Sequence, residues 1–350
     1  MTNIDADAHV IETPRTWSFM TKDEQQFRPQ IFVRDPADGA PYGSNQRNEY
    51  WKVGEHFQTK TNVGNDVPLE ARDMVDIQRR LDHMDQIGID VQVLFPTLFL
   101  RPVTTEHDCE LALIRSYNRW VADAWKRSNN RLRWVALPPL YSLPDPAKVR
   151  AELEFAKKNG ACGVFMRGFE CERLASDRYF FPLYEIAQEL DLAICFHAGN
   201  NSFANHNSYS RDLGVMIFKF PVMGVFLQLL SDEIPKLFPK LRWAFIEASA
   251  QWVPYMVREA KTRLIGKGVR TSDSLMTDNN FYVTTQKSDD LPWLLSEVGD
   301  DNFIIGTDYG HKDTAVEIEA LKRLGQDGSI PSASAKKIIA TNPGKLYGLN

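Results

Sequence analysis

The sequence lacks several features that would place it in common protein classes. It has no run of about 18 apolar residues, the minimum for a membrane-spanning helix. Its 41 Lys and Arg are outnumbered by 46 Asp and Glu, so a net charge of −5 offers no basic surface for nucleic acid. The four cysteines form no CxxC pair, and the N-terminus MTNIDADAHV lacks the basic and apolar parts of a signal peptide. These absences predict a soluble cytoplasmic protein that binds neither membranes nor nucleic acid.

What the chain does contain is eight short, β-rich apolar runs. They are Ile4–Ile11, Val91–Pro96, Arg133–Leu140, Gly163–Gly168, Leu192–Gly199, Arg242–Ser249, Phe281–Gln286 and Asn302–Tyr309. Several are apolar almost throughout, as expected of strands covered by helices on both faces. Eight such runs alternating with helical stretches indicate a (β/α)8 TIM barrel, with residues 1–350 as a single domain. A doubly wound open sheet shares the alternation, but the count of eight favours closure, and no GxGxxG motif follows the first run.

Helical stretches separate the runs. Apolar positions from Leu111 to Trp125 recur at helical spacing. Further helices are expected at Met74–Gly88, Asp145–Asn159, Phe180–Leu190, Gln251–Gly266, Asp289–Val298 and Asp313–Leu324. Residues 13–73 interrupt this rhythm with an unusually long connection. In a barrel, the connection after the first strand lies on the face that carries active sites, so we interpret 13–73 as a lid or partner-contact insertion. The alternative is an oligomer contact with no catalytic part.

Acidic and histidine residues, which are types that can bind metals, stand at the ends of four of the eight runs. Asp7 and His9 close the first run, and residues two apart in a strand point to the same side. His197 ends the fifth run, Glu247 the sixth and Asp308 the eighth, with His311 three residues later. One buried acid or histidine is usually a satisfied core group, but the strand ends of a barrel converge. Their convergence predicts a metal site.

These residues lie in motifs that resemble the amidohydrolase-related family (amidohydrolase family 2). The matching pieces are Asp5-x-Asp-x-His9, RLDHMDQIGIDVQVLFP, CFHAG, FIEASAQWVPY, GTDYGH and the terminal NPGKLYGL. The resemblance is to the branch that includes the metal-dependent decarboxylases of amino-carboxymuconate semialdehyde and of dihydroxybenzoates. It implies a TIM barrel in which a divalent metal is held by Asp7, His9, His197 and Asp308.

Two departures from that branch bear on the chemistry. The first strand carries Asp-x-His rather than the His-x-His of many relatives, and Glu247 stands where the decarboxylases have a catalytic histidine. With Glu12 and His311 added, the ligand set becomes rich in carboxylates, which favours iron or manganese over a thiolate-type zinc site. The set also exceeds the needs of one ion. It is similar to a subgroup with a dinuclear iron or iron–manganese centre that hydroxylates carbon with O₂ and includes an isobutyrate hydroxylase.

We therefore expect an O₂-dependent hydroxylase of a small organic acid or a related small-molecule substrate. The alternatives are a hydrolase or non-oxidative decarboxylase with a mononuclear site, where zinc would also serve, and a non-catalytic partner subunit. Expected catalytic residues are Glu247, Asp308 and His206. Arg167, at the end of the fourth run, is placed to bind a substrate carboxylate through two hydrogen bonds; the alternative is a structural ion pair. Trp252 is a second candidate for substrate binding, although such a residue more often packs. The family and the insertion suggest a homo-oligomer, or a hetero-oligomer with a related chain.

Overall fold

The computed structural model describes residues 2–34, 48–60, 62–208 and 214–349. Eight parallel strands form one sheet in the order β1-β5-β6-β7-β8-β9-β10-β11. They are β1 (Ile4–His9), β5 (Val91–Phe95), β6 (Leu132–Ala136), β7 (Ala161–Arg167), β8 (Ala193–His197), β9 (Trp243–Ile246), β10 (Phe281–Thr285) and β11 (Phe303–Ile305). Beyond the end of β11, the Asp308 amide donates to the Asp7 carbonyl and the His9 amide to the Tyr309 carbonyl, both at 2.9 Å. These bonds join the last strand to the first, and the predicted barrel is confirmed.

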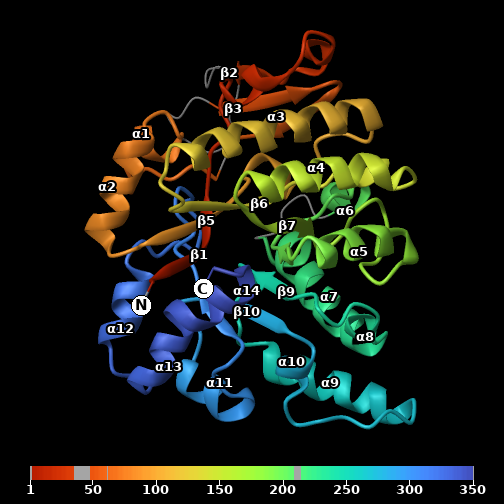
Figure 1. Cartoon of the computed structure of the whole chain (residues 1–350), viewed down its shortest axis with the longest axis vertical. Helices are drawn as coiled ribbons and strands as arrows, with labels where there is room; N and C mark the ends of the chain where they lie inside the picture. The colour runs from red at the N-terminus through yellow and green to blue at the C-terminus, as the bar shows by residue number, and fades with distance from the viewer. Residues whose placement is uncertain (1, 35–47, 61, 209–213, 350) are drawn as a thin grey trace.

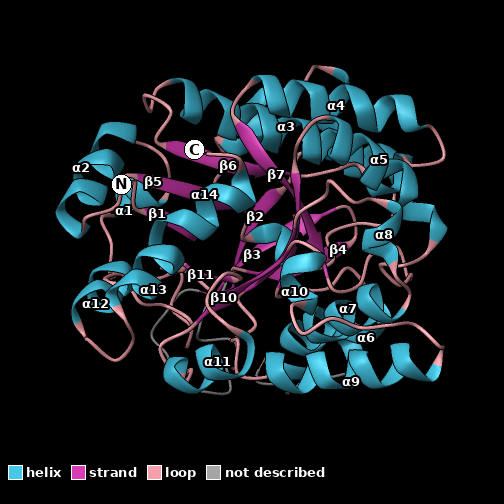
Figure 2. Cartoon of the chain, turned by 60° about the horizontal axis from the view of Figure 1, so that its bottom comes forward, coloured by secondary structure: helices cyan, strands magenta, loops and turns pink. Residues whose placement is uncertain are grey.

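Most of the helices surround the strands on the outside, whereas α14 lies across one end of the barrel (Figures 1 and 2). They are α1 (Leu69–Arg72), α2 (Ile77–Ile87), α3 (His107–Lys126), α4 (Pro146–Lys158), α5 (Phe181–Glu189), α6 (Phe203–Ser208), α7 (Phe220–Ser231), α8 (Ile234–Leu237), α9 (Val253–Gly266), α10 (Leu275–Asp278), α11 (Leu291–Val298), α12 (Ala320–Gln326), α13 (Ser332–Lys336) and α14 (Asn342–Tyr347). The longer helices bury apolar side chains against the sheet, which explains the helical periodicity of the sequence, whereas the short helix α6 has no buried residues.

Two helices begin later than the sequence pattern predicts. The expected helix Met74–Gly88 starts at Ile77, because the Asp76 side chain accepts the Arg79 amide at 3.0 Å and caps it. The expected helix Asp313–Leu324 starts only at Ala320. There the Asp313 carboxylate accepts the Ala315 amide at 2.7 Å, a local bond that competes with helix formation. Asp313 therefore lies in the connection after β11, at the mouth of the barrel.

The predicted insertion 13–73 contains a small antiparallel sheet. Its strands are β2 (Gln30–Arg34), β3 (Asn48–Val53) and β4 (His56–Thr59), while residues 35–47 and 61 lie outside the described part. The side-chain amide of Gln58 donates to the Leu98 carbonyl at 2.8 Å, and the backbone amide of Gly64 donates to the Gly310 carbonyl at 2.8 Å. Leu98 follows β5 and Gly310 follows β11, so the insertion is fastened across the carboxyl ends of the strands.

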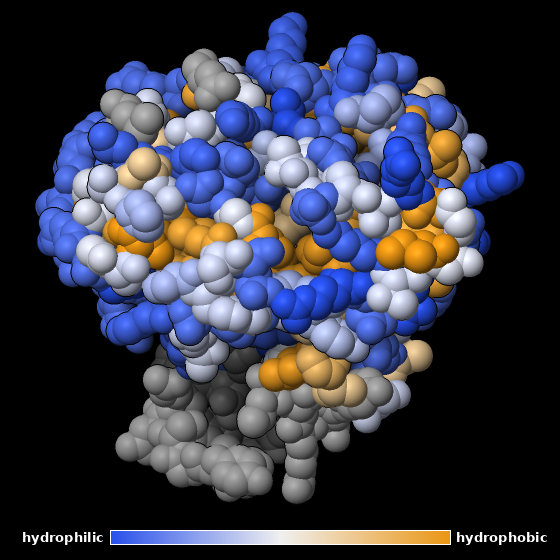
Figure 3. Space-filling model, turned by 90° about the horizontal axis from the view of Figure 1, so that it is seen from below, coloured by the Kyte–Doolittle hydropathy of each residue, from blue (hydrophilic) through white to orange (hydrophobic). Residues whose placement is uncertain are grey.

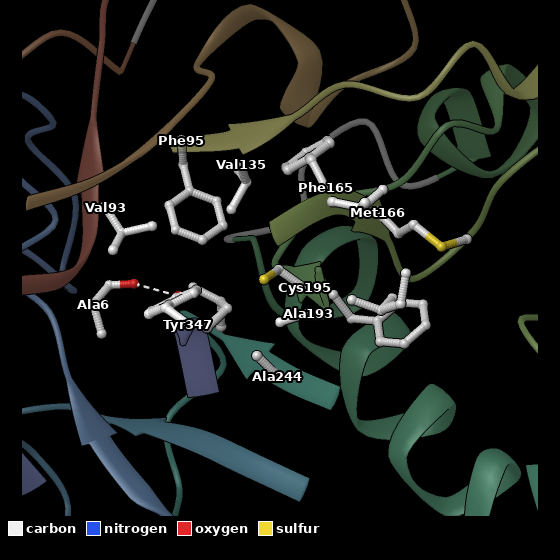
Figure 4. Close-up of a cluster of buried hydrophobic side chains, with 14 of the residues drawn as sticks. Ala6, Val93, Phe95, Val135, Phe165, Met166, Ala193, Cys195, Ala244 and Tyr347 are labelled. Carbon is white, nitrogen blue, oxygen red and sulfur yellow. Dashed lines mark hydrogen bonds between the residues drawn. The ribbon is translucent and has the colours of Figure 1, made fainter. Parts of the chain in front are cut away.

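The barrel interior is packed rather than open. Figure 4 shows Tyr347 of α14 inside a cluster that includes Phe95 and Phe165. The Tyr347 hydroxyl donates to the Ala6 carbonyl at 2.8 Å, which satisfies the one polar atom of that ring. The rings of Phe95 and Phe165 lie 5.1 and 6.1 Å from the ring of His197. An apolar floor thus lies directly beneath the strand ends.

The outer surface differs from this interior. Figure 3 shows a largely hydrophilic face on which hydrophobic side chains form a band. Isolated exposed apolar residues are ordinary on a folded protein. Within the described ranges, none of the helices has both the length and the apolar character needed to cross a bilayer.

Candidate metal centre

Six predicted ligands meet at the carboxyl ends of the strands. Asp7 and His9 end β1, His197 ends β8, Glu247 follows β9, and Asp308 and His311 follow β11; all six are buried. Glu247 and Asp308 have positive φ angles of 60° and 52°. A non-glycine residue adopts that conformation only where its surroundings enforce it, and such positions cluster at functional sites. The turns after β9 and β11 thus place both carboxyl groups at the ends of the strands.

Asp7, His9 and His197 form a first ligand group. Asp7 Oδ1 lies 3.4 Å from His9 Nε2 and 3.3 Å from His197 Nε2. The Nδ1 atoms of the two histidines donate to the backbone carbonyls of Pro96 at 3.0 Å and Ala198 at 3.1 Å. Each Nε2 therefore presents a lone pair toward Asp7. Burial acts to raise the pKa of Asp7, but His197 and His9 lower it through the hydrogen bonds and positive charge that they supply when protonated. A cation bound between the three groups would take the place of those protons.

His9 also belongs to a second group with Asp308 and His311. Asp308 Oδ1 lies 3.3 Å from His9 Nε2 and 2.7 Å from His311 Nδ1, and the two imidazoles are stacked with centroids 3.7 Å apart. The Thr97 hydroxyl donates its single hydrogen to the Val10 carbonyl at 2.8 Å. It must therefore accept from His311 Nε2, 2.9 Å away. His311 Nδ1 is left with a lone pair that faces the Asp308 carboxylate.

Glu247, Asp308 and Asp313 make the third group. Burial raises the pKa of Glu247 well above its usual range, and the nearby Asp313 carboxylate adds to the effect. Burial likewise raises the pKa of Asp308 well above normal, reinforced by Glu247. Three carboxyl groups so close together repel one another unless protons or a cation lie between them. The sequence reasoning missed Asp313, because the pattern placed it at the start of a helix.

The ligand atoms fit a divalent metal. Among the described residues, His9 Nε2, His311 Nδ1 and both carboxylate oxygens of Asp308 are buried without a hydrogen-bond partner. Such atoms are costly in a folded interior, and a cation would satisfy all of them. The first and second groups share His9, and the second and third share Asp308. Together the three groups therefore comprise seven side chains, four carboxylates and three imidazoles. That donor set suits iron or manganese and is larger than one ion of about four to six ligands requires.

The structure places Glu12 apart from these groups. Its carboxylate accepts the backbone amides of Thr97 at 3.1 Å and Leu98 at 2.9 Å. Burial raises the pKa of Glu12 to about 7. Glu12 therefore holds in place the loop that carries Thr97, whose hydroxyl contacts His311.

Three other candidate residues lie outside the ligand groups. Arg167 forms a bidentate pair with Glu170, with both N···O distances at 2.7 Å, and donates to the Phe99 carbonyl. The Trp252 indole donates to the Ala248 carbonyl at 3.0 Å and is buried. His206 lies on α6, and its Nδ1 is buried without a hydrogen-bond partner within the described ranges. The sequence suggested a substrate role for Arg167 but could not show that Glu170 occupies its guanidinium.

A cavity of about 340 Å³ opens onto the third ligand group. Glu247 and Asp313 lie in its wall, together with three cationic side chains, Lys60, Arg101 and Lys219. The Arg101 guanidinium lies 5.3 Å from the centre of the Phe218 ring. The remaining wall mixes apolar side chains with polar ones, Glu12 among them, and includes parts of the insertion. A small ligand with an apolar body and a negative charge suits this lining. Lys60 and Arg101 lie in loops, and Lys219 ends a short π-helix (Val215–Lys219) just before α7, so the sequence pattern did not point to any of the three.

Replacing Thr97 with valine tests the hydrogen bond to His311. Valine keeps the volume of threonine but removes the acceptor that fixes Nε2–H, so His311 loses its preferred orientation. We expect the affinity for Mn²⁺ to fall by about 10–100-fold, measured by titration calorimetry of the metal-free protein. Thr97→Ser retains the hydroxyl and should bind Mn²⁺ nearly as the native protein does. Equal affinities for the valine and serine variants would refute this role of Thr97.

Metal affinity should also increase with pH. Because burial and the neighbouring carboxyl groups raise the pKa of Glu247 and of Asp308, an incoming ion must compete with protons for both groups. Protons compete best at low pH, so we expect Mn²⁺ affinity to rise between pH 6 and 8 by about tenfold per pH unit for each displaced proton. Calorimetry in buffers of different ionisation enthalpy counts the released protons. Affinity that does not change with pH would contradict the protonated carboxyl groups.

Comparisons with known proteins agree with this geometry. A family model described as amidohydrolase matches residues 4–349, whereas no curated protein sequence matches the chain. The chain is 17% identical to an amidohydrolase from Mycobacterium avium subsp. paratuberculosis, with a TM-score of 0.78 over 100% of this chain and 98% of that one.

Two further solved structures are similar. One is a 4-oxalomesaconate hydratase from Rhodopseudomonas palustris, with 16% identity, a TM-score of 0.64 and coverage of 99% of this chain and 96% of that one. The other is a 5-carboxyvanillate decarboxylase from Novosphingobium aromaticivorans with bound manganese. It has 15% identity and a TM-score of 0.69, over 99% of this chain and 97% of that one. At these identities the likeness establishes the fold.

Proposed function

Because the chain belongs to the amidohydrolase family, whose enzymes depend on a divalent metal, we propose that its three ligand groups together hold two ions. On this centre we propose that it hydroxylates a small organic acid with O₂. Asp7, His9 and His197 would hold one ion, and Asp308, Glu247 and His311 would complete the second position. Iron or manganese bound there would supply the O₂ chemistry.

The observation that carries the proposal is Glu247. The decarboxylases that the sequence resembles have a histidine here, whereas this chain has a buried carboxyl beside Asp308. A carboxylate can bridge two ions at the spacing of two-metal sites, about 3.5–4 Å. The backbone of Glu247 is fixed independently of any metal, because its amide donates to the Thr284 hydroxyl at 2.7 Å. The side chain is thereby held over the strand ends.

The cavity supplies the other requirements of the reaction. Arg101 and Lys219 can orient a substrate carboxylate, and the apolar walls exclude water from the carbon to be hydroxylated. The overall change is substrate C–H plus O₂, two electrons and two protons, giving C–OH and water. The electrons must come from an external reductant.

The direct test is turnover with isotopically labelled oxygen. Metal-free protein would be reconstituted with Fe²⁺ and Mn²⁺ and supplied with ascorbate and a panel of small branched and aromatic carboxylic acids. We expect one atom of ¹⁸O from ¹⁸O₂ in the product and no turnover under argon. Turnover that proceeds equally under argon would refute the hydroxylase.

A second candidate is a non-oxidative decarboxylase or a hydratase or hydrolase with one ion. It is favoured by the similar structures, which include a 5-carboxyvanillate decarboxylase and a 4-oxalomesaconate hydratase. In that case Asp7, His9, His197 and Asp308 hold the ion, which polarises the substrate or lowers the pKa of a water molecule. Release of CO₂ under argon, or addition of water to an unsaturated acid, would identify this chemistry in the same assay.

A further inference from the structure

We infer that Asp313 is a ligand of the second ion and that Asn62, from the insertion, positions it. The inference rests on the proposed two-ion centre and adds two residues to it. Asp313 is one of only two members of the third ligand group that line the substrate cavity, the other being Glu247. An ion held by these carboxylates would therefore lie at the boundary between the buried centre and the substrate.

The loop after β11 is built to present Asp313. Its Oδ1 accepts the Ala315 amide at 2.7 Å, and the Glu317 amide donates to the Thr307 carbonyl at 3.0 Å. The second bond returns the loop to the end of β11. Oδ2 accepts from the Asn62 side-chain amide at 2.8 Å, and the Asn62 oxygen accepts the Lys312 amide at 3.2 Å. Each oxygen of Asp313 thus keeps a lone pair for a further partner.

A cluster of acids alone would not identify a metal site, but Asp308 supplies an independent observation. It is 2% exposed, and neither of its carboxylate oxygens has a hydrogen-bond partner among the residues that the structure describes. One ligand oxygen each of Asp308, Glu247 and Asp313 lies within 4.8 Å of the others. A buried carboxylate without partners, next to two more carboxyl groups, is unfavourable unless a cation is bound.

The position of Asp313 strengthens this argument. The side chain is exposed enough to turn toward solvent, where its charge would be hydrated. Instead, Asn62 and Ala315 hold it beside the carboxyl groups of Glu247 and Asp308, where like charges repel one another. The hydrogen bonds from Asn62 and Ala315 fix the Asp313 carboxylate in a position where it can bind a cation together with Glu247 and Asp308. Because Asn62 belongs to the insertion and also lines the cavity, it connects the second ion with the cavity wall.

The test is the number and affinity of bound Mn²⁺ ions, which does not require turnover. Metal-free native protein, Asp313→Asn and Asn62→Ala would be titrated with Mn²⁺ and analysed for metal after dialysis. Native protein should bind two ions per chain, and its spin-coupled pair should be visible by electron paramagnetic resonance. Asp313→Asn should bind one ion and lose the coupled signal. Asn62→Ala should bind the second ion about 10–100-fold more weakly, as is usual for residues that orient a ligand.

Asp273→Asn is a matched control, because Asp273 is fully exposed and belongs to none of the ligand groups. It should bind two ions with native affinity. Two ions bound with native affinity by Asp313→Asn would overturn the inference while leaving the two-ion centre intact. A single ion in the native protein would overturn the two-ion centre itself. Thermal unfolding of each variant separates loss of metal from loss of fold.

Discussion

Asp308→Asn is expected to abolish activity and remove the second ion, because Asp308 belongs to both ligand groups from which that ion would be held. Asparagine keeps the shape of the side chain but loses its charge. Its amide nitrogen would also compete for the lone pair of His311 Nδ1, which lies 2.7 Å from Asp308 Oδ1. We expect turnover to fall by at least about 10³-fold, since both the charge and the ligand geometry are lost. Metal analysis together with product formation measures the effect.

Asp5→Asn is the appropriate control for this variant. Asp5 lies on β1, two residues before Asp7, and is equally buried, but it belongs to none of the ligand groups. Its carboxylate accepts hydrogen bonds from Thr307 and Gln92, so its replacement should lower stability without changing the number of ions. If Asp5→Asn and Asp308→Asn lose metal to the same extent, the loss reflects damage to the barrel rather than a missing ligand.

The barrel and most of its ligands could be predicted from the sequence because both follow from strand periodicity. Consecutive parallel strands bring their carboxyl ends together, so Asp7, His197 and Asp308 had to converge once eight strands were counted. His311 followed from its position near Asp308. None of these predictions needed any knowledge of loop conformation.

The residues that the sequence could not place depend on hydrogen bonds between side chains and backbone in loops. Glu12 was a predicted ligand, but its carboxylate accepts the amides of Thr97 and Leu98 and belongs to none of the three ligand groups. Asp313 looked like the start of a helix because acids favour that position, yet its bond to Ala315 holds it outside the helix. Local sequence gives the same signal for both outcomes. Only the tertiary contacts decide between them.

Arg167 illustrates a different limit. Its place at the end of β7 predicted that it would face the barrel mouth, where a guanidinium could bind a substrate carboxylate. Glu170, three residues later, turns back and pairs with it at 2.7 Å. Of the cations that do line the cavity, Lys60 and Arg101 lie in loops and Lys219 ends a short π-helix before α7, and no periodicity in the sequence predicts the course of these segments.

Glu247→Gln has the second large expected effect and separates the leading chemistries. If Glu247 bridges two ions, glutamine should remove one of them and abolish O₂-dependent turnover, because an amide bridges metals poorly. The ion held by Asp7, His9 and His197 should remain, since Glu247 is not in that group. Metal analysis and turnover with and without O₂ measure both parts of the prediction.

The other roles of Glu247 lead to different results for the same variant. If it acts as a general acid or base beside a single ion, Glu247→Gln should keep its metal and lose about 10²–10⁴-fold in rate, with no dependence on O₂. If the carboxyl is only structural, stability should fall while metal content and rate stay unchanged. The Thr284 hydroxyl holds the backbone of residue 247 in every case, so the glutamine should occupy the same place as the glutamate. A variant that keeps two ions and full activity would therefore exclude Glu247 from the site, because misplacement of the side chain could not explain that result.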